Sequence, residues 1–143
     1  MSDVLHVVRL TVPAGTPRDE PVRKVVSLDG RALTGFYVYF PPGCCLLVGV
    51  RLKYGQAQLF PSPPGEWLRG HGYLVGSRTW WPFPESPCKL TLEAYNEDSR
   101  YDHTLEVYVD YLARGEIDLA EELRRLRVLY ELVAATLYGV RPG

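Results

Sequence analysis

Histidine and cysteine are among the side chains that could bind a metal, and the sequence holds three of each. A site could join His71, His103 and Cys88. No two of these residues stand at a spacing typical of metal ligands, such as i, i+4 on a helix or Cys-x-x-Cys. We therefore expect no metal and no cofactor. His6 is then a core or interface residue, and the other two histidines lie in loops.

Cysteine is also a candidate nucleophile, and Cys44 follows a Pro-Pro-Gly turn at the mouth of an expected strand. A nucleophilic cysteine needs a base beside it, and nothing in the sequence marks one. Cys45 shares the apolar surroundings of Cys44. An odd cysteine count with one adjacent pair is no disulfide framework. We interpret all three cysteines as small core residues whose reduced thiols fit assembly inside a cell.

Three carboxylates, Glu93, Glu106 and Asp110, face outward from expected strands. They could act in pairs, as the carboxylates of glycosidases do. Charged residues that alternate with apolar ones along a strand are more often its solvated face. We expect this second role, no catalytic residue and therefore no enzyme.

Five aromatic residues crowd into one proline-rich stretch of the chain: Trp67, Tyr73, Trp80, Trp81 and Phe83. Aromatic platforms bind sugar rings, and they also anchor protein interfaces. A third interpretation is a hydrophobic plug that closes one end of the fold. We expect a plug or a partner contact, with glycan binding as the alternative.

Composition narrows the class of function further. The 143 residues suffice for one domain with a sizeable core plus an appendage. Sixteen basic against 17 acidic residues give a net charge of −1, which argues against a general nucleic-acid binder. No run reaches the roughly 18 apolar residues that a membrane span needs, and no signal-peptide pattern is visible. We expect neither nucleic acid nor a membrane as partner.

Apolar and polar residues alternate along most of the chain up to Gly115, which is typical of half-buried β-strands. The stretch from Trp80 to Pro87 holds three prolines and cannot form a central strand. About eight strands are expected, spaced as in sandwiches and jelly rolls. Their ranges are 4–12, 22–28, 33–40, 46–54, 58–60, 73–75, 89–96 and 104–111.

After Gly115 the hydrophobic period changes to spacings of four and three. The residues that follow this 4-3-4-3-4 spacing are Leu119, Leu123, Leu126, Tyr130, Val133 and Leu137. Such a series is the seam of a short coiled coil. We expect a helix from Leu119 to Tyr138, capped by Asp118 and ended by Gly139. An amphipathic helix on its own sheet would show a similar stripe, but the 3.5-residue period favours self-association.

The expected fold is therefore all-β: a jelly-roll-like, two-sheet antiparallel sandwich with one C-terminal α-helix. We place the sandwich in residues 1–114 and an oligomerisation helix in residues 115–143.

Several segments of the strand domain resemble a small jelly-roll virion protein of tailed bacteriophages and related tailed viruses. They are LTVPAGT at 10–16, FPPGC at 40–44, LVGVR at 47–51, LFPS at 59–62, GEWLRG at 65–70, YNED at 95–98 and HT at 103–104. The resemblance covers the chain from about Val4 to Leu112 and does not include the helix. It implies a structural component of a virion, often trimeric, without catalysis.

We therefore expect a non-enzymatic virion structural protein, such as a capsid decoration, spike-base or tail or neck component, assembled in the host cytoplasm. It would self-associate through its helix and a sheet edge, as a trimer rather than a dimer, and contact other virion proteins. The alternative is a carbohydrate-binding module, which could be the receptor-binding part of a virion.

Overall fold

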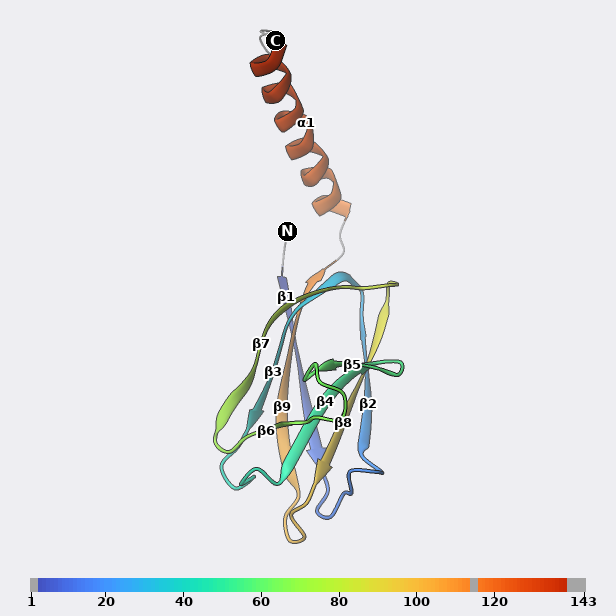
Figure 1. Ribbon diagram of the computed structural model, residues 1–143, viewed down its shortest axis with the longest axis vertical. Coiled ribbons are helices and arrows are strands. Elements are labelled where there is room, and N and C mark those ends of the chain that lie inside the picture. Colours follow the sequence, from blue (N-terminus) through green and yellow to red (C-terminus); the bar gives the residue numbers. More distant parts are fainter. Residues whose placement is uncertain (1–2, 114–115, 139–143) are drawn as a thin grey trace. The chain divides into compact units, whose positions relative to one another are not determined.

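A computed structural model describes residues 3–113 and 116–138, with helix side chains described from Leu123 to Ala135. The described chain forms two compact units, Asp3–Ala113 and a unit that holds the helix. The strands of the first unit make two antiparallel sheets packed face to face (Figure 1). The predicted all-β two-sheet sandwich with one C-terminal helix is thereby confirmed.

The strands are β1 Asp3–Val12, β2 Val22–Leu28, β3 Gly30–Phe40, β4 Val48–Tyr54, β5 Ala57–Phe60, β6 Leu68–Arg69, β7 Tyr73–Pro82, β8 Cys88–Asn96 and β9 His103–Ala113. Sheet A has the order β1-β9-β3-β7. Sheet B has the order β2-β8-β4-β5, with β6 beside β4. Most connections cross from one sheet to the other, so that late strands return to lie between early ones. This interleaving is the topology of a jelly roll.

The core lies between the sheets, where the inward positions of the alternating strands meet. Leu90 and Leu92 of β8 are fully buried, as are Val48 and Val50 of β4 and Phe36 of β3. Each such side chain stabilises the fold by about 1.5–3 kcal/mol relative to an exposed one.

The strand β7, at one edge of sheet A, differs most from expectation. A short strand at 73–75 was predicted, but β7 continues to Pro82. It lies at the sheet edge, where a proline interrupts no ladder on its free side. Its pairing with β3 shifts register between Leu33 and Gly35, which accommodates the irregular sequence.

The connection into β4 also differs from expectation. The strand begins at Val48 rather than at Leu46, because Cys45 and Leu46 have φ angles of 50° and 64°. These left-handed conformations are incompatible with an extended strand. No strand was predicted between residues 60 and 73, but this segment contains β6.

The helix α1 spans Glu116–Tyr138. It begins before Leu119, so Asp118 lies inside the helix and its predicted role as N-cap is wrong. Gly139, predicted to end the helix, lies outside the described residues. Within the described residues, no helix combines the length and apolar character needed to cross a membrane.

Candidate assembly surfaces

The seam predicted for α1 is open to solvent in the single chain. Leu123 and Leu126 are 59% and 63% exposed, and Tyr130 and Val133 are 75% and 54% exposed. The side chains of Leu119 and Leu137 lie outside the described residues. Large apolar side chains at a regular 3-4-3 spacing, all more than half exposed, form a surface suited to another helix.

The apolar surface of α1 is wider than a two-stranded seam requires. Leu129 flanks Tyr130 and Leu126 and is exposed. An extra apolar position beside the seam is typical of bundles, in which each helix contacts more than one neighbour. Next to this apolar surface, Arg127 Nε lies 3.4 Å from Glu131 Oε1, one turn further along the helix. The width of the apolar stripe therefore favours more than two helices.

The five aromatic residues singled out in the sequence do not form one cluster. The Trp67 ring meets the Tyr95 ring edge-on, with centroids 4.8 Å apart. The Arg51 guanidinium lies 4.0 Å from the centre of the Trp67 ring. Trp67 is thus half-buried and packed within its own domain, on the outer face of sheet B.

Trp81 and Phe83 form a separate group that packs against the core. The Trp81 ring lies 5.3 Å from Tyr54 and 5.9 Å from Phe83, and Phe83 lies 6.5 Å from Tyr111. Trp80 and Tyr73, by contrast, are exposed. Of the five aromatic residues, these two present the most open surface to a partner.

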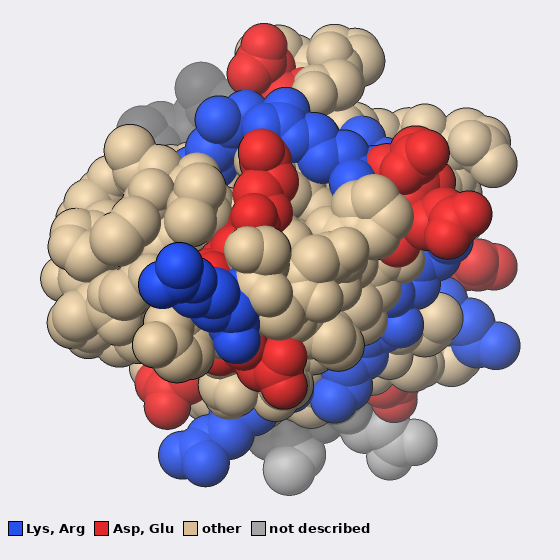
Figure 2. Space-filling model, turned by 90° about the horizontal axis from the view of Figure 1, so that it is seen from below, with Lys and Arg blue, Asp and Glu red and all other residues tan. Residues whose placement is uncertain are grey.

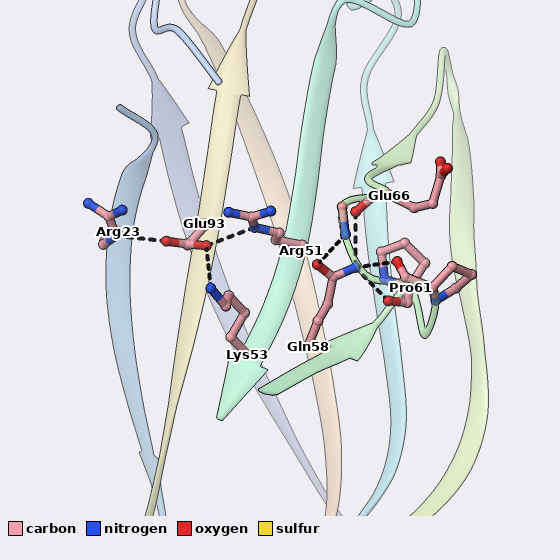
Figure 3. Close-up of polar contacts among 9 residues, drawn as sticks. Arg23, Arg51, Lys53, Gln58, Pro61, Glu66 and Glu93 are labelled. Atoms are coloured by element: carbon pink, nitrogen blue, oxygen red, sulfur yellow. Dashed lines mark hydrogen bonds and ion pairs between the residues drawn. The ribbon is translucent and has the colours of Figure 1, made fainter. Parts of the chain in front are cut away.

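A buried carboxylate organises the outer face of sheet B. Glu93 is almost fully buried and accepts hydrogen bonds from Arg23 Nε and Arg51 Nε, both at 2.7 Å (Figure 3). Lys53 Nζ lies 3.7 Å from the same carboxylate. The predicted solvated face is therefore wrong at Glu93, because three cations on the neighbouring strands β2 and β4 cover it.

The environment of Glu93 fixes its charge. Burial alone would raise the pKa of the carboxyl, but the hydrogen bonds from Arg51 and Arg23 and the charge of Lys53 outweigh burial and lower it. A carboxylate held ionised in this way joins β2, β8 and β4 across the sheet.

We expect Glu93→Gln to lower the free energy of unfolding by about 2 kcal/mol at pH 7, since it leaves the partly buried Arg51 and Lys53 without a counter-charge. Because the folded-state pKa is lowered, the contribution of Glu93 is complete above its unfolded pKa of about 4.3 and is lost as the pH falls through the folded value. Urea unfolding at pH 7 and pH 3 measures both effects.

Glu97→Gln is the matched control for Glu93→Gln, because Glu97 pairs with Arg18 in a half-exposed position. Its cost should be below about 1 kcal/mol. A Glu93→Gln cost that is the same at pH 3 as at pH 7 would contradict the assignment.

The loop that carries Trp67 is braced by one side chain. Gln58 Nε2 donates to the carbonyl oxygens of Pro61, Pro63 and Glu66 at 2.7, 2.9 and 3.0 Å (Figure 3). The two N–H donors of one amide are thus shared among three backbone acceptors in a loop that has few strand hydrogen bonds of its own.

The outer face of sheet A is not covered in this way. It holds an open hollow of about 580 Å³, lined by Leu5, Tyr37, Tyr39, Leu74, Glu106 and Tyr108. Leu5 and Leu74 are more than half exposed at its two sides. The sequence analysis missed this surface, although a signal exists: Leu5 and Val7 occupy positions of the first strand that alternation assigns to solvent.

The residues considered as catalytic or metal-binding candidates do not come together in one site. Glu93 lies on sheet B, whereas Glu106 and Asp110 lie on sheet A. Burial raises the pKa of the Cys44 thiol to about 11, which keeps it protonated at neutral pH. Cys45 is exposed, contrary to its predicted place in the core.

The histidines also occupy separate places. His6 is exposed on β1 and His71 is exposed in a loop, whereas His103, predicted to be a loop residue, is buried at the start of β9. Its Nε2 lies 2.9 Å from Asp98 Oδ2. In the described part of the chain, no three His, Cys, Asp or Glu side chains gather as metal ligands would.

The segments that carry the sequence resemblance include one hydrogen-bonded group at an end of the sandwich. Asn96 Nδ2 donates to the carbonyl oxygens of Val12 and Tyr101, at 3.1 and 2.9 Å. The backbone nitrogen of Asn96 donates to Thr16, and that of Gly15 donates to Asp98, both at 2.9 Å. These residues therefore have a shared structural role in joining the β1–β2 connection to the β8–β9 turn.

Acidic and basic side chains are interspersed over the face shown in Figure 2 and do not gather into a field of one sign. Comparison of the chain with family models, with curated proteins and with solved structures gives no match. The resemblance to virion proteins therefore stays a prediction.

Proposed function

We propose that this chain is a non-enzymatic structural protein of a virus particle that self-associates through α1, with three copies favoured over two. The observation that carries the proposal is the exposed seam of α1, in which Leu123, Leu126, Tyr130 and Val133 are all more than half exposed. A contiguous exposed apolar surface of this kind is typical of a protein–protein contact.

Three further observations support this proposal. The extra apolar position at Leu129 favours a bundle over a pair. The strand order is that of a jelly roll, the fold that the sequence resemblance implies. Trp67 and Trp81 pack within the domain, which leaves little of the aromatic platform that a carbohydrate-binding module would need.

The mass of the protein in solution tests the proposal. The seam is shorter than three heptads, so apolar contacts beside it on the same helix, such as Leu129, must add to the helix contact. We expect light scattering at micromolar concentration to show at least three chains. A mass near the 16.2 kDa of a single chain would contradict self-association.

A further inference from the structure

Apart from the two-residue β6, the described sandwich has four edge strands, two in each sheet. Three of them carry features that prevent edge-to-edge pairing. The strand β2 carries Arg23 and Lys24, and β5 is only four residues long and is followed by Pro61. The strand β7 has a register shift and ends at Pro82.

The fourth edge strand, β1, is less protected, because its two charged residues, Asp3 and Arg9, are of opposite sign and lie six residues apart toward its two ends. It is ten residues long, contains no proline, glycine or lysine, and pairs with β9 at ten consecutive positions without a shift. Its other side therefore offers an unbroken row of backbone donors and acceptors. Leu5 and Val7 project from its outer face and are 56% and 50% exposed.

We propose that β1 pairs with β1 of a second copy, antiparallel and with the two-fold axis at His6. In this register Asp3 faces Arg9, Leu5 faces Val7 and Val4 faces Val8. Between Asp3 and Arg9, every apolar residue then meets an apolar residue, His6 meets His6 of the second copy, and the two charged residues meet residues of opposite charge. Cross-strand pairs of these kinds stabilise an antiparallel sheet.

Both charged residues have room for this contact. The Arg9 side chain is 79% exposed, and its ion pair with Glu106 is long, at 3.7 Å. Asp3 lies near another acid, since burial and then the charge of Asp3 raise the pKa of Asp110. A second copy would bring its Arg9 to Asp3 and relieve this repulsion between like charges.

The two contacts together have a consequence for assembly. A three-fold contact and a two-fold contact on one chain build an assembly larger than either: a closed hexamer of dihedral symmetry, a closed shell or an extended lattice. This consequence rests on the proposed function, whereas the pairing of β1 does not.

The pairing is tested in the Leu126→Asp chain, whose helix seam is disabled. Sedimentation at up to about 100 µM, where weak pairs are populated, should show twice the 16.2 kDa chain mass. Adding Val7→Lys should give a single chain, because lysine blocks an open edge. Adding Val25→Lys instead, at a valine of β2 that is also at least half exposed, should leave the dimer intact.

A monomer at all concentrations, or an equal effect of the two lysines, would overturn the proposal. The helix is assessed separately, because the full chain with Val7→Lys alone should keep three copies. Asp3→Arg in the Leu126→Asp chain tests the register and should weaken the dimer about tenfold, since it sets two Arg–Arg pairs face to face. Exchanging both charges, Asp3→Arg with Arg9→Asp, should restore much of the affinity; no recovery would overturn the register.

Discussion

The substitution Leu126→Asp should dissociate the helix-mediated assembly without unfolding the strands. Leu126 lies in the middle of the seam, so each helix of an assembly would bury one carboxylate among the leucines of its neighbours. A buried carboxylate without a partner costs several kcal/mol or must be neutralised. In the Val7→Lys chain, which isolates the helix contact, we expect the mass to fall from three chains to one.

The matched control is Val128→Asp, which adds the same charge at a valine that is also more than half exposed, two residues further on. Two residues rotate the position by about 200° around a helix, so this carboxylate points away from the seam. It should leave the mass unchanged. Far-UV circular dichroism completes the test: if Leu126→Asp removes the β signal, α1 is part of the sandwich's fold, and the separation into a folding unit and an assembling unit is wrong.

Alternation along the strands predicted the fold class because it reports which side of a strand faces the core. Leu90 and Leu92 follow it, and both are buried. The same alternation assigned Glu93 to the solvated face. Glu93 does point away from the core, but it is covered by side chains of β2 and β4 that are distant in sequence. A period of two gives the face of a sheet and says nothing about what covers that face.

The candidate surfaces also show that a sequence pattern predicts features that are local in the chain and not those that depend on strand order. The seam of α1 was predicted because its spacing is local, within one continuous helix. The exposed edge of β1 depends on strand order. The strand pairs with β9 on one side, and no strand of the described chain pairs with its other side. The crowding of Trp67, Trp80 and Trp81 in the sequence likewise could not show that they belong to different sheets and faces.

Trp81→Ala should lower the free energy of unfolding by about 2–3 kcal/mol, somewhat less than full burial of a tryptophan would imply. Its half-buried ring packs against Tyr54, Phe83 and the edge of the core. The neighbouring Trp80 points to the opposite side of β7 and is 64% exposed, so Trp80→Ala should change stability by less than about 0.5 kcal/mol. Urea unfolding followed by far-UV circular dichroism compares the two variants without depending on tryptophan fluorescence.

The comparison of Trp80 and Trp81 separates a packing role from a contact role at adjacent positions. Because the two side chains lie on opposite faces, the double variant should lose little more stability than Trp81→Ala alone. A cost of Trp80→Ala as large as that expected for Trp81→Ala would show that both rings belong to the core and would remove Trp80 as a contact residue. With the expected asymmetry, Trp80→Ala becomes the variant for testing incorporation into a particle, because any loss of incorporation then cannot be due to a destabilised sandwich.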